Sequence, residues 1–225
     1  MRRFFNWELI INKFCSYGVT CGNSRLHQMR IKHVLIFFIT LIASLPGCYP
    51  KYANPHIEIQ TSLGDIEVEL FPSKAPKTVG AFLSYIDSGF YKNASFYRVL
   101  TNDNQPSNAP KSELVQGGIW RTNYRRAVSL PGIPHETTRQ TGLLHTNGVL
   151  SLARQAPGTA TTEFFICVGD QPGFDFGGEN NPDGQGYAAF GRVVKGMDIV
   201  LRIQQQREND QAFDPPVPIY DVTRL

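Results

Sequence analysis

One arginine, set among aromatic residues and glycines, is the residue best suited to chemistry in this chain. Arg98 lies in the string Phe-Tyr-Arg-Val at 96–99, and three further strings follow: Gln-Gly-Gly at 116–118, Glu-Phe-Phe-Ile at 163–166 and Ala-Ala-Phe-Gly at 188–191. The sequence pairs them with no thiol nucleophile, phosphate-binding loop or spaced metal ligands. One fixed cation in an apolar setting suits a reaction that makes and breaks no covalent bond.

Together the four strings resemble the cyclophilin-type peptidyl-prolyl cis-trans isomerases, over about residues 56–225. The resemblance implies an enzyme that accelerates rotation about the peptide bond before proline in folding or unfolded polypeptides. It also implies that the protein works as a monomer, without a cofactor or a metal. Arg98 matches the catalytic arginine of the family, whereas the alternative is an arginine that only pairs with a carboxylate at a strand end.

The chemistry expected of Arg98 follows from the energetics of the peptide bond. The bond before proline prefers trans by only about 0.5–1 kcal/mol, but its rotation barrier is roughly 18–20 kcal/mol because rotation removes amide resonance. A site lowers that barrier by holding the proline ring in an apolar pocket and by offering a donor that favours the twisted amide. Arginine suits the second task because its guanidinium stays charged and presents several rigid N–H donors.

The resemblance also implies a substrate site around Arg98. Phe165 is expected to form the floor of the proline pocket, and Gln116 to orient the arginine. The backbone edge at residues 153–154 is expected to pair with the bound peptide by strand addition. The full set is Phe96, Leu114, Gln116, Ala153, Arg154, Glu163, Phe165, Phe174 and Tyr187. For Phe96, Leu114 and Phe165 the alternative is an ordinary place in the core, which is usual for such residues.

Several positions depart from the family pattern. Glu163 replaces a glutamine, which removes a donor and adds a negative charge, so we expect it either to pair with Arg98 or to alter the peptide preference. Glu113 stands where the family has a pocket phenylalanine, and Phe174 where cyclosporin-sensitive members have tryptophan. Tyr187 replaces a frequent histidine, and the loop at 101–111 is about ten residues longer than in the compact form. The two acids motivate an alternative function, a proline-peptide binding module or holdase with little turnover.

The pattern of apolar residues predicts the elements that hold these residues. Alternation at 57–60 and 66–70 predicts a hairpin, and further strands are expected at 95–100, 148–153, 163–168, 188–194 and 217–224. Helical spacing is found from Pro76 to Gly89, and shorter helices are expected at 136–144 and 197–204. We therefore predict a mainly β fold, a closed antiparallel barrel of about eight strands capped by two or three helices.

The first 55 residues have a different character. Residues 29–47 combine a basic start with an apolar run at 34–45, and Leu-Pro-Gly-Cys at 45–48 resembles a lipobox. This pattern predicts a signal peptide and a lipid on Cys48, with a tether at 48–55 and export to the periplasm or cell envelope. The alternatives are an uncleaved membrane anchor and a short buried helix, although a span needs roughly 20 apolar residues. Residues 1–28 are interpreted as a gene-model extension ahead of a start at Met29.

Charge and cysteine content limit the other classes of function. The chain has 22 basic and 19 acidic side chains, but residues 1–47 hold six of the former and one of the latter. The remainder is therefore slightly acidic and offers no basic patch for nucleic acid. Of four cysteines, Cys167 lies in an apolar run and is expected to be a buried strand residue, so no disulfide framework is predicted. Contact with a membrane is expected only through the N-terminal lipid.

Overall fold

The computed structural model describes residues 52–225. The predicted extension, signal peptide, lipid site at Cys48 and first part of the tether lie outside these residues. Within the described part, no helix has the length and apolar character needed to cross a membrane. The last tether residues pack on the domain, because Tyr52 stacks on His56 and Asn54 donates a hydrogen bond to Glu69.

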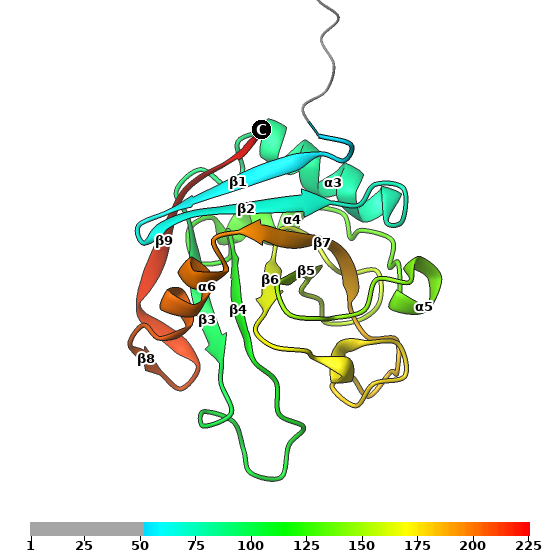
Figure 1. Ribbon diagram of the computed structural model, residues 1–225, viewed down its shortest axis with the longest axis vertical. Helices are drawn as coiled ribbons and strands as arrows, with labels where there is room; N and C mark the ends of the chain where they lie inside the picture. The colour runs from blue at the N-terminus through cyan, green and yellow to red at the C-terminus, as the bar shows by residue number, and fades with distance from the viewer. Residues whose placement is uncertain (1–51) are drawn as a thin grey trace, which may run out of the picture. The chain divides into compact units, whose positions relative to one another are not determined.

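Eight strands form a closed antiparallel barrel, as predicted. Neighbouring strands follow the order β1-β2-β7-β5-β6-β4-β3-β9, and β9 pairs back onto β1 to close the ring (Figure 1). The strands are β1 (His56–Thr61), β2 (Gly64–Leu70), β3 (Ala94–Leu100), β4 (Leu114–Gly118), β5 (Val149–Leu152), β6 (Phe164–Cys167), β7 (Ala188–Lys195) and β9 (Ala212–Arg224), with a two-residue β8 (Glu208–Asn209) paired to β9. Closure leaves the barrel without a free edge.

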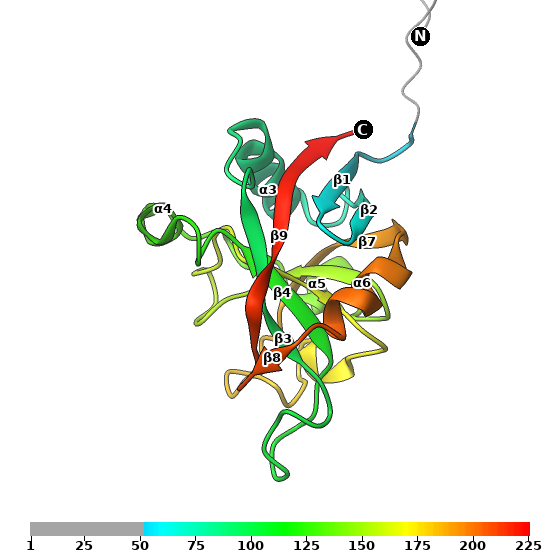
Figure 2. The same ribbon diagram turned by 90° about the vertical axis from the view of Figure 1, so that its left-hand side faces the viewer.

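Four α-helices accompany the barrel in residues 52–225, one more than the largest number predicted. They are α3 (Pro76–Asp87), α4 (Tyr124–Ser129), α5 (Thr138–Thr141) and α6 (Met197–Gln204), and a 3₁₀ turn covers Pro172–Phe174. The unpredicted helix is α4, which protrudes from the body of the domain (Figure 2). Only Ala127 of α4 is buried, so its sequence carries no apolar periodicity that would reveal it.

Helix α3 shows how the sequence builds the cap. Pro76 occupies its first turn, where the missing N–H costs nothing. The buried carboxylate of Glu136 accepts hydrogen bonds from the backbone N–H groups of Lys77 and Thr78, which stabilises the positive end of the helix. The buried stripe includes Phe82, whose ring packs against Phe164 inside the barrel.

The buried apolar residues form two separate clusters. The larger fills the barrel, and its members alternate along the strands with residues that face outward. The smaller lies outside the barrel wall and consists of Leu100, Leu114, Val149, Phe165, Cys167, Phe174 and Ala189. Along β6 the alternation sends Phe164 and Ile166 inward, and Phe165 and Cys167 outward. The second cluster is the floor on which the candidate site rests.

A bulge in β3 decides which way the arginine points. The pairing registers of β3 with β4 and with β9 both shift between Phe96 and Arg98, so Tyr97 is an extra residue in the strand. Phe96 and Val99 therefore both belong to the barrel interior. The bulge leaves Tyr97 and Arg98 as consecutive residues on the outer side, where both line cavities.

Candidate active site

A cavity of about 220 Å³ lies over the smaller apolar cluster, and we call it the Arg98 cavity. It holds several times the liquid volume of one water molecule, enough for a small ring. Its wall brings together eight of the predicted residues from β3, β4, β6 and the segments after β5 and before β7. The lining is Arg98, Leu100, Gln105, Ser112, Leu114, Gln116, Ala153, Arg154, Phe165, Phe174, Asn180 and Tyr187.

The floor of this cavity is aromatic. The ring of Phe165 meets the rings of Phe174 and Tyr187 edge-on, with 5.2 Å between centroids in each pair. Such T-shaped contacts add to the stability gained by burial and hold each ring in one orientation. Phe165 and Phe174 are nearly fully buried. Phe165 and Leu114 are thus core residues and cavity residues at once, so the two alternatives considered for them are not exclusive.

Phe96 does not belong to this site. It is fully buried in the barrel interior, where its ring contacts Phe164 at 5.8 Å. The prediction that Phe96 binds substrate is therefore wrong for this side chain, because the bulge at Tyr97 separates it from the face that carries Arg98. Its neighbour across the sheet is Gly117, where a Cβ would come within 2.9 Å of the Phe96 ring. The first glycine of Gln-Gly-Gly makes room for this aromatic ring.

Two neutral amides hold the guanidinium of Arg98. Its Nη1 donates to Oε1 of Gln116 at 3.3 Å, and its Nη2 donates to Oε1 of Gln211 at 2.9 Å. Within the described part of the chain, no carboxylate lies within ion-pairing distance of Arg98. No ion pair with a described residue therefore offsets the cation, and it has N–H donors that the two amides do not use.

Gln211 was not anticipated from the sequence. It lies in the turn between β8 and β9, where Asp210 and Gln211 both have positive φ angles. Its side-chain Nε2 donates to the carbonyl of Asn104, and its backbone N–H donates to Glu208. The long loop at 101–111 thus supports Arg98 through Gln211, and it also supplies Gln105 to the cavity wall. The residues at 208–211 belong to no catalytic motif, so nothing in the sequence pointed toward this position.

Glu163 does not pair with Arg98, so the first of the two roles expected for it is wrong, whereas an effect on peptide preference stays a prediction. Its Oε1 instead accepts from the backbone N–H groups of Ile119 and Trp120, at 3.0 and 3.1 Å, and from the hydroxyl of Thr162. Burial raises the pKa of this carboxyl, and those donors together with Tyr97 oppose the rise. Gln116 and Tyr97 occupy the space on the Arg98 side.

Arg154 is committed to holding a loop. Its guanidinium forms a two-pronged ion pair with Asp183 at 2.7 and 2.9 Å, and it also donates to the carbonyl of Gly186. It lies over the ring of Tyr187 at 5.4 Å. The side chain has no exposed area, so it shapes the cavity by fixing the loop before β7. Glu113, by contrast, is absent from the cavity lining, so its charge does not face the pocket.

A buried histidine supports the aromatic floor from below. His145 Nδ1 lies 2.8 Å from Asp175, and its Nε2 lies 3.0 Å from the hydroxyl of Ser151. The order of the three residues resembles a hydrolytic triad, but Ser151 and His145 are almost completely buried and no substrate reaches the hydroxyl. The imidazole stacks at 6.1 Å on Phe165, so the trio positions that ring.

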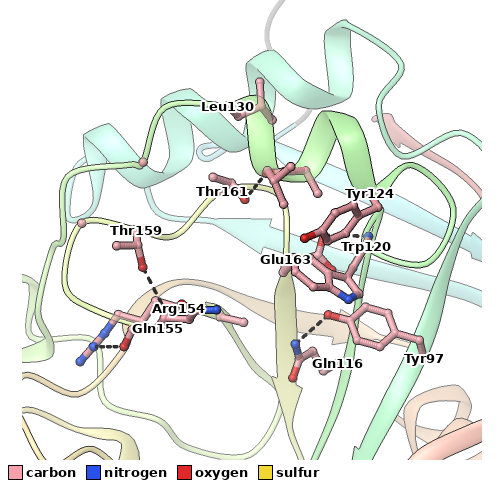
Figure 3. A pocket seen from close by; sticks show the side chains of 15 residues that line it. Tyr97, Gln116, Trp120, Tyr124, Leu130, Arg154, Gln155, Thr159, Thr161 and Glu163 are labelled. Atoms are coloured by element: carbon pink, nitrogen blue, oxygen red, sulfur yellow. Dashed lines mark hydrogen bonds between the residues drawn. The ribbon is translucent and has the colours of Figure 1, made fainter.

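A second, larger cavity of about 650 Å³ adjoins the first (Figure 3). The two share Gln116, Ala153 and Arg154. The larger cavity is walled on its far side by Trp120 and by residues of α4, the first of which is Tyr124. The rings of Trp120 and Tyr124 meet edge-on at 4.6 Å. In residues 52–225 no three His, Cys, Asp or Glu side chains gather as a metal site would require.

Comparison with known proteins shows which family the chain belongs to. Residues 56–224 match the family model described as cyclophilin type peptidyl-prolyl cis-trans isomerase/CLD. The chain is 38% identical over 167 residues to a peptidyl-prolyl cis-trans isomerase of Acinetobacter baylyi, covering 74% of this chain and 80% of the relative. It is 36% identical to peptidyl-prolyl cis-trans isomerase B of Escherichia coli, with 74% of this chain and 94% of that protein covered.

A solved structure gives the same fold. The crystal structure of a cyclophilin type peptidyl-prolyl cis-trans isomerase of Cryptosporidium parvum aligns with a TM-score of 0.59 at 22% identity, covering 76% of this chain and 98% of that one. Barrel, site and family match lead to one conclusion: this chain belongs to the cyclophilin-type peptidyl-prolyl cis-trans isomerases. It is accordingly an isomerase enzyme.

Proposed function

We propose that the protein accelerates rotation about X-Pro bonds in folding or unfolded polypeptides, with Arg98 stabilising the twisted amide. The observation that carries this proposal is the position of Arg98. Its guanidinium lies at the wall of an apolar cavity, held by two neutral amides and by no carboxylate of the described residues. Such a cation interacts at full strength with an acceptor placed in the cavity.

The geometry suits the electronic change during rotation. As the amide twists, resonance is lost and a lone pair becomes localised on the prolyl nitrogen, which turns that nitrogen into a hydrogen-bond acceptor. A donor that meets this lone pair favours the transition state over both planar ground states. In this proposal the proline ring packs on Phe165 and Leu114, and Arg98 donates from the cavity wall. The backbone at 153–154 pairs with the bound peptide by strand addition.

The proposal includes export. A signal peptide at 29–47 and a lipid on Cys48 would place the isomerase domain in the periplasm or cell envelope, acting there as a monomer on proline-containing clients. Mass spectrometry of the native protein should then find an acylated N-terminus at Cys48. An intact N-terminus at Met1 in a cytoplasmic fraction would contradict the export proposal and leave the isomerase proposal standing.

The direct test is a rate measurement. The purified protein should accelerate cis-trans isomerisation of an X-Pro peptide in an assay that follows the fraction of cis isomer. Binding of the same peptide, measured in parallel, separates the two candidate functions. Affinity with an unchanged isomerisation rate would favour the binding module or holdase, whereas acceleration at catalytic protein concentrations supports the enzyme. The charge argument for the alternative is weaker now, since Glu163 does not pair with Arg98.

A further inference from the structure

Two side chains connect Arg98 to the buried carboxylate of Glu163. Gln116 accepts from Arg98 with its Oε1, and its Nε2 donates to the hydroxyl oxygen of Tyr97 at 2.8 Å (Figure 3). Tyr97, Gln116 and Glu163 line the same larger cavity. The Tyr97 oxygen accepts from Gln116, and Oε2 of Glu163 is buried and has no hydrogen-bond partner among the described residues.

Arg98, Gln116, Tyr97 and Glu163 form a row of neighbouring polar side chains, and the direction of each hydrogen bond in this row matters. A carboxamide can turn over and exchange its oxygen with its nitrogen, and a phenol can donate or accept, but an ionised carboxylate only accepts. The unpartnered Oε2 of Glu163 is an acceptor without a donor, and a Tyr97 hydroxyl proton directed at it would satisfy both groups. The Tyr97 oxygen is then free to accept from Nε2 of Gln116, which leaves Oε1 of Gln116 facing the guanidinium.

We propose that Tyr97 and Glu163 are positioning residues that fix the orientation of the Gln116 carboxamide and, through it, the place of Arg98. The inference rests on the isomerase function proposed above. It assigns a role to the Glu-for-Gln departure at 163 that requires no ion pair with the catalytic cation.

The surroundings of Glu163 hold it in place for this role. Its Oε1 is occupied by the N–H groups of Ile119 and Trp120 and by the Thr162 hydroxyl, so the remaining unpartnered oxygen is Oε2. Gly118 leaves the space that the carboxylate fills, since a Cβ there would collide with Oε2. At a φ of +145° that position favours glycine in any case.

With a glutamine at 163, the direction in which each hydrogen bond of the row is donated would no longer be fixed. Its amide N–H can donate to Tyr97, which allows the Tyr97 hydroxyl to donate to Gln116 instead. The carboxamide of Gln116 is then free to turn its NH₂ group toward the Arg98 guanidinium, where two donors face each other. Tyr97→Phe reaches a similar end by a different route, because Nε2 of Gln116 loses its acceptor.

The kinetic test compares Tyr97→Phe, Glu163→Gln and the double variant at pH 8, because alkaline pH favours the ionised form of the Glu163 carboxylate. Each single change should lower kcat about fivefold to tenfold with KM little changed, the rate equivalent of one misplaced hydrogen bond. The double variant should be no slower than the slower single variant, because both act through one row. Tyr91→Phe is the control: its hydroxyl is also buried, more deeply than that of Tyr97, and donates to the carbonyl of Thr162 and not to Gln116 or Glu163. It should leave kcat unchanged.

Two results would contradict the positioning role of Tyr97 and Glu163. In the first, the kcat of each single variant lies within twofold of the wild-type value, or is no lower than the kcat of Tyr91→Phe. The other is effects that multiply in the double variant. NMR of the wild type adds a readout that needs no substitution: the Gln116 carboxamide should be ordered, and an order parameter under about 0.6 would contradict the proposal. A wild type without isomerase activity but with an ordered Gln116 would remove the proposed function and leave this hydrogen-bond row intact.

Discussion

Two buried glutamates in different parts of the barrel have pKa values that are shifted in opposite directions. Glu67, on β2, and Glu163, before β6, are 8% and 9% exposed. Glu67 lies 2.7 Å from Nζ of Lys195 and 2.7 Å from Nδ1 of His56. These hydrogen bonds, that of Lys195 first, lower the pKa of Glu67 to about 2, whereas burial raises the pKa of Glu163.

The two carboxylates differ in two ways: Glu163 lies deeper, so that desolvation dominates its pKa shift, and only Glu67 has a cation beside it. Glu67 has a cation and serves the seam between β2 and β7. Glu163 has only uncharged donors, although Arg98 is two side chains away. The acid and the cation are kept apart, so Glu163 does not neutralise Arg98, as the proposed electrostatic mechanism requires.

The largest expected effect is on isomerase activity, which should depend on the cation near Glu163 and not on the cation near Glu67. Arg98→Ala should lower kcat/KM by about 10²–10³, the usual loss when a donor made for the transition state is removed. Lys195→Ala removes the cation of the other region and should leave the rate unchanged. Arg98→Lys should recover little, because an ammonium lacks the guanidinium fork. The measurement is X-Pro peptide isomerisation, with circular dichroism to check folding. A folded Arg98→Ala protein with full activity would exclude the catalytic assignment.

A smaller loss should follow from releasing one of the amides that hold Arg98. Gln211→Ala removes the acceptor 2.9 Å from Nη2 and should lower kcat about fivefold, since one hydrogen bond of about 1 kcal/mol is lost. Gln60→Ala is the control near the other glutamate, because Gln60 donates only to Glu58 on β1 among its described contacts. Equal rates for Gln211→Ala and Gln60→Ala would show that Gln211 does not position the arginine.

The sequence predicted the barrel class and most of the cavity wall, but strand β4 at Leu114–Gly118 was not among the strands predicted. Alternating strands, the helix at Pro76–Asp87 and the cavity residues Leu114, Gln116 and Phe165 follow from local patterns or from motifs. The bulge at Tyr97 does not, because a bulge is a property of the register between strands and not of one strand. For that reason Phe96 was placed on the wrong face.

The remaining errors concern partners that lie far apart in the chain. Gln211 is 113 residues from Arg98 and reaches it through a turn whose residues carry no catalytic motif. The expectation that Glu163 pairs with Arg98 considered charge alone. Backbone N–H groups at 119 and 120 took the carboxylate instead, and no side-chain pattern announces a backbone donor.

Glu163 should also set part of the pH dependence of stability. Its folded pKa is raised above the usual 4.5, so its contribution to stability is fully present below about pH 4.5 and is lost as pH rises through the folded pKa. Tyr91 and Tyr97, the titratable neighbours, stay neutral there because burial raises the pKa of both. Glu163→Gln removes the loss, so its Tm relative to wild type should rise by about 2–4 °C between pH 4 and pH 8. A constant difference across that range would contradict the raised pKa.

The smallest effect is expected at Glu67, with the opposite sign. Its folded pKa of about 2 lies below the usual 4.5, so its contribution is present above pH 4.5 and is lost as pH falls toward 2. Glu67→Gln should therefore destabilise the protein at pH 7 by roughly 0.5–1 kcal/mol, the range of partly exposed ion pairs, because the Lys195 side chain is 74% exposed. The deficit should shrink below pH 4 and in high salt, which screens exposed charges. Urea unfolding at pH 7 and pH 3, with and without salt, measures both. A deficit as large at pH 3 as at pH 7 would mean that Glu67 acts by packing and not by charge, and its contrast with Glu163 would then not be electrostatic.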